Sequence, residues 1–158
     1  MNKKDTVVFD LDGTLLDTLE DLKNSVNYAM TQCGYPEHTL DEVRRYVGNG
    51  ILLLMQRAIP GGKDDPNFDK AFTLFKEHYG KHCNDTTKPY AGIMELLRTL
   101  KENNIKIAIV SNKADFAVKE LNAIYFKDLI PVAIGEKESE GIRKKPAPDT
   151  VIEALKQL

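Results

Sequence analysis

The sequence lacks tryptophan, has only two cysteines, and contains no apolar run near the roughly 20 residues of a membrane helix. Cys33 and Cys83 do not form a Cys-x-x-Cys pair, which argues against a zinc or redox site and fits a reducing compartment. The net charge of −2 gives no strong field that would attract nucleic acid. With no apolar signal segment at the N-terminus, we expect a cytoplasmic protein that binds neither nucleic acid nor a membrane.

The most informative stretch covers residues 7–15 and reads Val-Val-Phe-Asp-Leu-Asp-Gly-Thr-Leu. A short apolar run followed by turn residues is typical of a buried parallel strand. The carboxyl ends of such strands carry the binding sites of open α/β sheets. Asp10 is predicted at that end and Asp12 in the turn beyond it, although a solvated acidic turn remains the alternative.

Two neighbouring carboxylates limit the chemistry of this stretch. At ~5 Å and an effective dielectric constant of ~20 they repel each other by roughly 3 kcal/mol, so the site must hold a proton or a cation. Mg²⁺ fits, because it takes one or two carboxylates and completes its shell with water and phosphate oxygens. A carboxylate can also attack phosphorus while a second acid transfers protons.

Residues 17–85 carry helical signals throughout. Thr18 with Asp21, and Thr39 with Glu42, match the capping-box pattern at the start of a helix. Gly34 ends the first helix. The predicted helices cover residues 18–33, 39–46, 51–59 and 67–82.

The remainder alternates between strands and helices, which predicts right-handed parallel crossovers. We expect strands over 105–110 and 130–134, a turn at 111–113, and helices over 92–103, 116–123 and after 148. The predicted fold class is therefore α/β, a doubly wound, Rossmann-like parallel sheet with an inserted helical domain. Residues 1–16 and 86–158 form the α/β core in this division, and residues 17–85 form the helical cap.

Two later segments can join the Asp10 site. Ser111 follows the second strand, so its hydroxyl and nearby N–H groups lie at the same sheet edge and can bind phosphate oxygens. Lys145 follows a basic run and precedes Pro146. Its ammonium can offset the charges of Asp10 and a phosphoryl group. The alternatives are an ordinary turn and a solvated loop.

These three pieces, in this order, resemble the motifs of the haloacid dehalogenase superfamily: Asp-x-Asp-Gly-Thr at 10–14, Ile-Val-Ser-Asn-Lys at 109–113, and Lys-Pro-Ala-Pro-Asp at 145–149. The resemblance implies that Asp10 is the nucleophile, Asp12 the general acid/base and Lys145 the catalytic cation. It implies Mg²⁺ as cofactor, with Asp10 and Asp12 as its ligands. The phosphate-binding residues are expected to be Gly13, Thr14, Ser111 and Asn112.

A fourth acidic motif, which members of the superfamily carry after a further strand, does not occur in the 158 residues. We therefore expect a C-terminally truncated member whose missing strands would lie beside the Asp10 strand. An apolar strand left at a sheet edge favours pairing, so self-association through this edge is also expected.

The helical insert and the loop Gly48-Asn49-Gly50 resemble the phosphoglycolate phosphatase family, in which this loop faces the substrate. The resemblance implies a Mg²⁺-dependent phosphomonoesterase with an aspartyl-phosphate intermediate, acting on a small phosphorylated metabolite, most simply 2-phosphoglycolate. The alternatives are a β-phosphoglucomutase-like or pyrophosphatase-like enzyme, or an inactive phosphate-binding remnant that lacks the fourth motif.

Overall fold

The computed structural model describes residues 4–158. The chain forms two compact units, one made of residues 1–16 and 89–158 and the other of residues 17–88. The sequence placed the second boundary after residue 85, three residues earlier. Residues 86 and 87 stay with the helical unit because both bind the carboxylate of Asp21.

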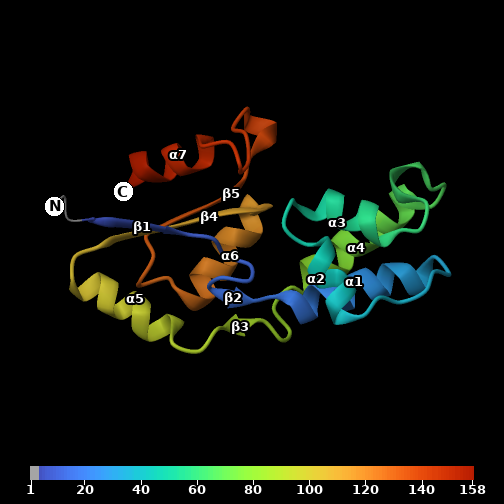
Figure 1. Ribbon diagram of the computed structural model, residues 1–158, viewed down its shortest axis with the longest axis horizontal. Coiled ribbons are helices and arrows are strands. Elements are labelled where there is room, and N and C mark those ends of the chain that lie inside the picture. The colour runs from blue at the N-terminus through green and yellow to red at the C-terminus, as the bar shows by residue number, and fades with distance from the viewer. Residues whose placement is uncertain (1–3) are drawn as a thin grey trace. The chain divides into compact units, whose positions relative to one another are not determined.

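The first unit contains a parallel sheet in the order β1-β4-β5, formed by β1 (Thr6–Phe9), β4 (Lys106–Ala114) and β5 (Val132–Glu136). Three helices belong to it: α5 (Ile93–Glu102), α6 (Asp115–Tyr125) and α7 (Asp149–Gln157). Figure 1 shows α5 and α6 on one side of the sheet and α7 on the other. This three-layer arrangement confirms the predicted α/β fold class.

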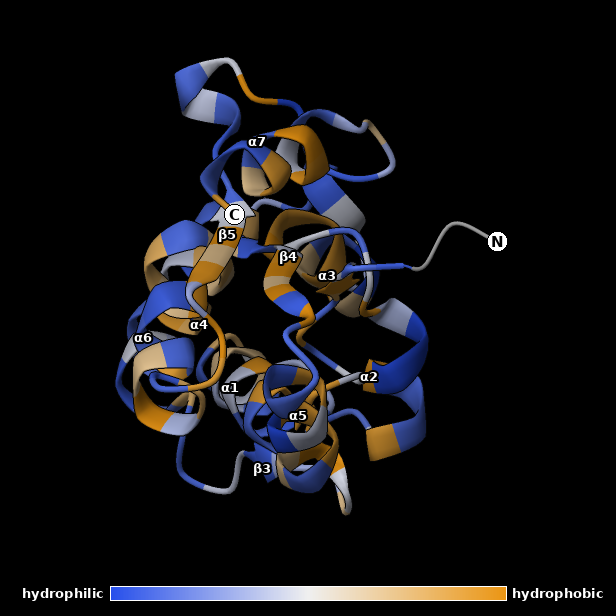
Figure 2. Cartoon of the chain, turned by 90° about the vertical axis from the view of Figure 1, so that its left-hand side faces the viewer, coloured by the Kyte–Doolittle hydropathy of each residue, from blue (hydrophilic) through white to orange (hydrophobic). Residues whose placement is uncertain are grey.

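The alternating directions of the side chains along β4 explain why helices cover both faces of the sheet. Ile107 and Ile109 pack with α5 and α6, in a cluster that includes Leu97 and Leu121. The intervening residues of β4 pack on the opposite face with Ala154 of α7. Because side chains of a strand point alternately to its two faces, one apolar strand serves both layers. Figure 2 shows that β5, the strand next to β4, is also coloured as hydrophobic.

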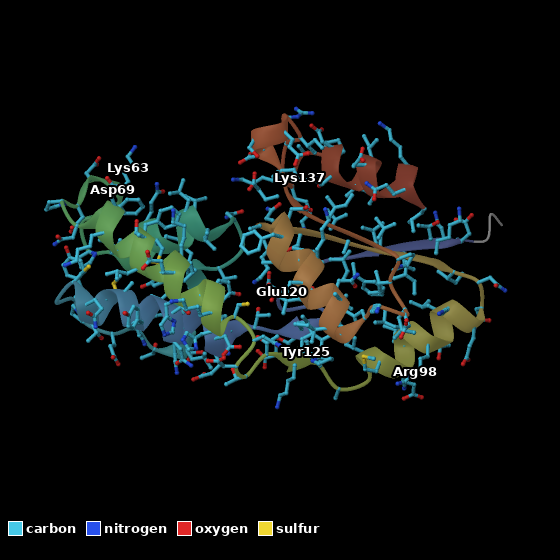
Figure 3. The ribbon with its side chains drawn as sticks, turned by 180° about the vertical axis from the view of Figure 1, so that it is seen from behind. Lys63, Asp69, Arg98, Glu120, Tyr125 and Lys137 are labelled. Carbon is cyan, nitrogen blue, oxygen red and sulfur yellow. The ribbon has the colours of Figure 1, made fainter. Side chains whose placement is uncertain are left out.

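The helices of this unit are amphipathic. In α5, Leu97 is fully buried while Arg98, labelled in Figure 3, is exposed on the outer side. Glu120 lies on the exposed side of α6, next to the buried Leu121. The apolar faces are therefore directed toward the sheet.

Two strand predictions need correction. β4 continues through Ala114, so residues 111–113 belong to an irregular part of the strand and not to a turn. Pairing resumes at Ala114, opposite Glu136, after this irregularity. β5 begins at Val132, so Pro131 precedes the strand and costs it no ladder hydrogen bond. A short two-stranded sheet, β2 (Leu16–Asp17) with β3 (Lys88–Pro89), was not predicted.

The second unit contains α1 (Leu19–Gln32), α2 (Leu40–Tyr46), α3 (Ile51–Ala58) and α4 (Phe68–His82). Two 3₁₀ turns also occur, η1 (Gly62–Asp64) here and η2 (Glu138–Glu140) in the first unit. The four helices share one apolar core that includes Val26, Met30, Met55 and Phe75. These bounds confirm the helices predicted for residues 17–85.

The two predicted capping boxes have different outcomes. Thr39 and Glu42 form theirs, with Glu42 N donating to Thr39 Oγ1 at 3.3 Å and Thr39 N donating to Glu42 Oε2 at 2.7 Å. Thr18 is the N-cap residue of α1, as predicted, but its side chain makes no capping hydrogen bond, so the capping box predicted with Asp21 is wrong. Asp21 is directed instead to Thr86 and Thr87, which supply both N–H and hydroxyl donors.

Within residues 4–158, no helix is both long enough and apolar enough to cross a membrane. β1 lies at one edge of the three-stranded sheet that these residues form. Self-association through this edge stays a prediction.

Candidate active site

Asp10 and Asp12 directly follow β1, at the carboxyl edge of the sheet. Asp10 Oδ1 accepts a hydrogen bond from Leu11 N at 2.9 Å, and 44% of the side chain is exposed. Gly13 adopts a φ of 75°, a left-handed conformation that glycine tolerates without a steric penalty. The acids therefore lie on a tight turn that the Asp-Gly sequence itself favours.

The N–H groups of this turn are already bonded within it. Gly13 N donates to Leu16 O at 2.9 Å, and Thr14 N donates to Leu11 O at 3.2 Å. The expected phosphate-binding role of Gly13 and Thr14 therefore cannot use these two N–H groups without opening the turn. For Thr14 the hydroxyl remains a candidate donor, and the role stays a prediction.

Lys145 reaches the first acid from a distant part of the sequence. Its Nζ lies 3.0 Å from Asp10 Oδ1 and donates to Val110 O at 2.9 Å. Phe9 pairs with Ile109, so Asp10 and Val110 are the next residues on two adjacent strands. A cation at this point neutralises the nucleophile candidate and remains close enough to contact a phosphoryl group on it.

The loop that carries Lys145 is held at two places. Arg143 donates through Nε and Nη2 to the carboxylate of Asp149 at 2.9 and 2.7 Å. This fork holds the pKa of the Asp149 carboxyl below its usual range. Asn112 binds the Lys145 backbone itself, through Lys145 N to Oδ1 at 2.9 Å and Nδ2 to Lys145 O at 3.0 Å.

Ser111 and Lys113 occupy the irregular part of β4 and are both buried. Ser111 Oγ accepts from Lys113 N at 3.2 Å. Lys113 Nζ lies 2.9 Å from Asp12 Oδ1, and only 5% of the lysine side chain is exposed. The motif at 109–113 contains Lys113, but the sequence alone assigns it no role; a lysine that comes soon after the apolar part of a strand is the signal that points to it.

The structure thus joins Asp10 with Lys145, Asp12 with Lys113, and Asn112 with Lys145. The loop Gly48-Asn49-Gly50 belongs to the other unit and is described only within it. Gly48 and Gly50 have φ values of 130° and 88°, and Asn49 is exposed. Their expected contact with substrate stays a prediction.

The donor set for a cation is small. Among residues 4–158, no group of three or more His, Cys, Asp or Glu side chains could hold a metal ion. Mg²⁺ needs only one or two carboxylates when water and phosphate supply the other oxygens. The acids at positions 10 and 12 meet that minimum.

Comparisons with known proteins agree with this geometry. The family model of haloacid dehalogenase-like hydrolases matches residues 7–158. A phosphoglycolate phosphatase of Thiobacillus denitrificans is 36% identical over 113 residues, which are 69% of this chain and 50% of that protein. The phosphoglycolate phosphatase of Nitrosospira multiformis is 32% identical over 96% of this chain and 68% of its own length.

A solved structure from Lactobacillus delbrueckii subsp. bulgaricus, provisionally named a phosphoglycolate phosphatase, superimposes with a TM-score of 0.87 and 32% identity. It covers 98% of this chain, and the chain covers 73% of it. The matched segment spans about half of the Thiobacillus relative. Because the family model matches nearly the whole sequence, this chain belongs to the haloacid dehalogenase-like hydrolase family.

Proposed function

We propose that the protein is a phosphomonoester hydrolase that acts through a phosphoryl group transferred to Asp10. The observation that carries this proposal is the 3.0 Å contact between Asp10 Oδ1 and Lys145 Nζ, formed by residues far apart in the sequence. An anionic nucleophile repels a phosphate ester, and an adjacent ammonium offsets that repulsion as the two approach.

In the proposed reaction, a carboxylate oxygen of Asp10 attacks phosphorus and the ester oxygen leaves. In its protonated form Asp12 donates a proton to that leaving oxygen, which yields the free alcohol and an aspartyl-phosphate and leaves Asp12 as the carboxylate that pairs with Lys113. Asp12 then accepts a proton from water as the water attacks phosphorus, which releases inorganic phosphate and restores Asp10. Lys145 and the Ser111 hydroxyl stabilise the phosphoryl oxygens, since positioning and charge neutralisation dominate this class of reaction.

Mg²⁺ is the cofactor that this proposal requires. The carboxylate of Asp10 and the backbone carbonyl of Asp12 would hold it. When bound, the cation supplies charge neutralisation for the phosphoryl oxygens.

For the substrate we propose a small phosphorylated metabolite, most simply 2-phosphoglycolate. The support is that relatives 32–36% identical carry the name phosphoglycolate phosphatase. The alternatives are a β-phosphoglucomutase-like activity, a pyrophosphatase-like activity and an inactive phosphate-binding remnant. The experiment below distinguishes them from the proposed activity.

The test measures phosphate release with and without Mg²⁺ from a panel that includes 2-phosphoglycolate, β-glucose 1-phosphate and pyrophosphate. Replacement Asp10→Asn removes the nucleophile and should lower turnover by a factor on the order of 10⁴ or more. Phosphoglycolate should rank first. A low rank for it would defeat the substrate proposal, whereas undiminished turnover in Asp10→Asn would defeat the nucleophile assignment.

A further inference from the structure

The side-chain amide of Asn112 makes a reciprocal pair of hydrogen bonds with one residue. Its Oδ1 accepts from Lys145 N at 2.9 Å, and its Nδ2 donates to Lys145 O at 3.0 Å. Both bonds go to the backbone of Lys145, 33 residues away in the sequence. A paired contact of this kind fixes position and orientation together, as a bidentate ligand does.

This contact decides where the ammonium of Lys145 lies. The side chain has four rotatable bonds and could sweep a wide volume if its backbone were free. With the backbone held, Nζ reaches both Asp10 Oδ1 and Val110 O, at 3.0 and 2.9 Å. The other brace of the loop, the Arg143–Asp149 pair, uses an arginine whose side chain is 71% exposed. The half-buried Asn112 is therefore the inner anchor.

We propose that Asn112 is a positioning residue that acts through Lys145, and that its main task is not to bind phosphate directly. The inference rests on the proposed function, because the group to be positioned is the cation that meets the phosphoryl oxygens. Each end of an asparagine amide can make two hydrogen bonds, so one donor and one acceptor site remain on Asn112. Direct phosphate binding is thus the competing role that an experiment must separate.

The variant Asn112→Asp separates the two partners of the amide. A carboxylate of the same shape still accepts from Lys145 N, but its second oxygen then faces the carbonyl oxygen of Lys145. That oxygen pair repels, so the loop should move away from β4. Asn24→Asp, at an exposed position of α1, is the matched control because it makes the same change of shape and charge.

The measurement is the affinity for inorganic phosphate in the presence of Mg²⁺, by calorimetry on the full chain. We expect Asn112→Asp to weaken phosphate binding about tenfold, within the range known for coupled neighbouring residues. In a Lys145→Met background the same change should alter the affinity by less than about twofold, since the group it positions is gone. Asn24→Asp should match the wild type.

Two results would overturn the inference. A tenfold loss that recurs in the Lys145→Met background would mean that residue 112 acts on phosphate directly, by contact or by charge, and not through Lys145. An unchanged affinity of Asn112→Asp would mean that the amide does not position the loop. Thermal unfolding checks that each variant folds, and if Asn112→Asp does not, the shorter Asn112→Ser carries the same comparison.

The phosphate-release assay distinguishes this failure from failure of the proposed function. One outcome is that the wild type releases phosphate and that the Asn112→Asp and Lys145→Met changes lower the phosphate affinity independently of each other. That outcome would refute only the positioning role of Asn112. Another outcome is that the wild type binds phosphate, and Asn112→Asp weakens binding only when Lys145 is present, but no ester is hydrolysed. That outcome would refute only the proposed hydrolase activity. A wild type that binds no phosphate would contradict both.

Discussion

Asp12 and Lys113 form an ion pair in a largely dry environment, with 18% and 5% of their side chains exposed. Taking two charges out of water is costly, and the cost is offset only while both partners remain. The residue proposed to move protons is therefore tied to a lysine on the neighbouring strand. Its orientation and the local stability depend on the same contact.

Replacement Lys113→Met should lower the free energy of unfolding by about 2–4 kcal/mol, because it leaves the Asp12 carboxylate without this cation. Urea denaturation at neutral pH measures the change. Lys156→Met, at an exposed position of α7, is the control and should lie within about 0.5 kcal/mol of the wild type. A loss no larger than that of the control would show that the pair contributes nothing.

Asp21 is a buried acid that accepts hydrogen bonds from several donors, and it lies outside the candidate active site. Burial alone would raise the pKa of its carboxyl, but the hydrogen bonds from Thr86 and Thr87 outweigh burial and lower it from the ordinary value of 3.8. A folded-state pKa below the unfolded one stabilises the protein above that unfolded value. The contribution is lost as the pH falls through the folded-state pKa.

For Asp21→Asn we expect a loss of about 2–3 kcal/mol at pH 7, since the amide turns a donor toward groups that are themselves donors. The difference from the wild type should shrink as the pH falls below about 4, because the carboxyl of the unfolded chain takes up its proton there, before the folded carboxyl with its lowered pKa does. Denaturation curves at pH 7 and pH 3 give both values. Equal differences at the two pH values would refute the assignment.

At this scale the sequence located the acids and lysine of the candidate site because they belong to short local motifs. It also predicted that Lys145 lies near Asp10, but it could not identify the partner of Asp12 or the residue that holds the Lys145 backbone. The pair Asp12–Lys113 joins residues 101 positions apart, and Asn112 binds the backbone of a residue 33 positions away. Such contacts depend on strand register and on the path of a loop, which no local pattern specifies.

Among the elements, β5 and α6 approach each other closely at Gly135. A Cβ there would lie 2.4 Å from Asp115 Cα and 2.6 Å from Lys113 O, which is closer than real contacts allow. Gly135 N also donates to Asp115 Oδ1 at 2.9 Å. The glycine therefore lets the start of α6 pack directly on the strand, beside the irregular part of β4.

Gly135→Ala should destabilise the protein by about 1–3 kcal/mol, the usual range for overpacking. Gly80→Ala is the matched change in α4, where a Cβ would meet nothing within 4 Å. It should stabilise its helix by about 0.5–1 kcal/mol, because alanine loses less backbone entropy than glycine. Thermal unfolding of the two variants should shift in opposite directions, and shifts of the same sign would contradict this packing.

The spacing of apolar residues predicts where helices and strands occur, and it predicts the four helices of residues 17–85. Local signals failed where tertiary partners decided the outcome. Thr18 and Asp21 have the sequence of a capping box, but Asp21 binds Thr86 and Thr87 instead. β4 runs past its apolar segment because Ala114 pairs with Glu136, a contact that polar residues 111–113 gave no reason to expect.

The molecule as a whole consists of an α/β unit interrupted by a helical one, and the chain passes between them twice. The α/β unit has one apolar cluster on each face of its sheet. The helical unit has one apolar core among its four helices. The change from helical to alternating patterning after residue 85 made this division visible in the sequence.

The most direct test of the account is to trap the phosphoryl group on the protein. The wild type is mixed with Mg²⁺ and 2-phosphoglycolate that is radiolabelled in its phosphate, and is quenched in acid so that label bound to the protein can be counted. In a parallel sample borohydride reduces the aspartyl-phosphate to homoserine and releases the phosphate, and mass spectrometry of the digest locates that homoserine. We predict label on Asp10, and none on Asp10→Asn. Phosphate release by the wild type without label on Asp10, when the label survives the quench in a control phosphoenzyme, would contradict the central claim.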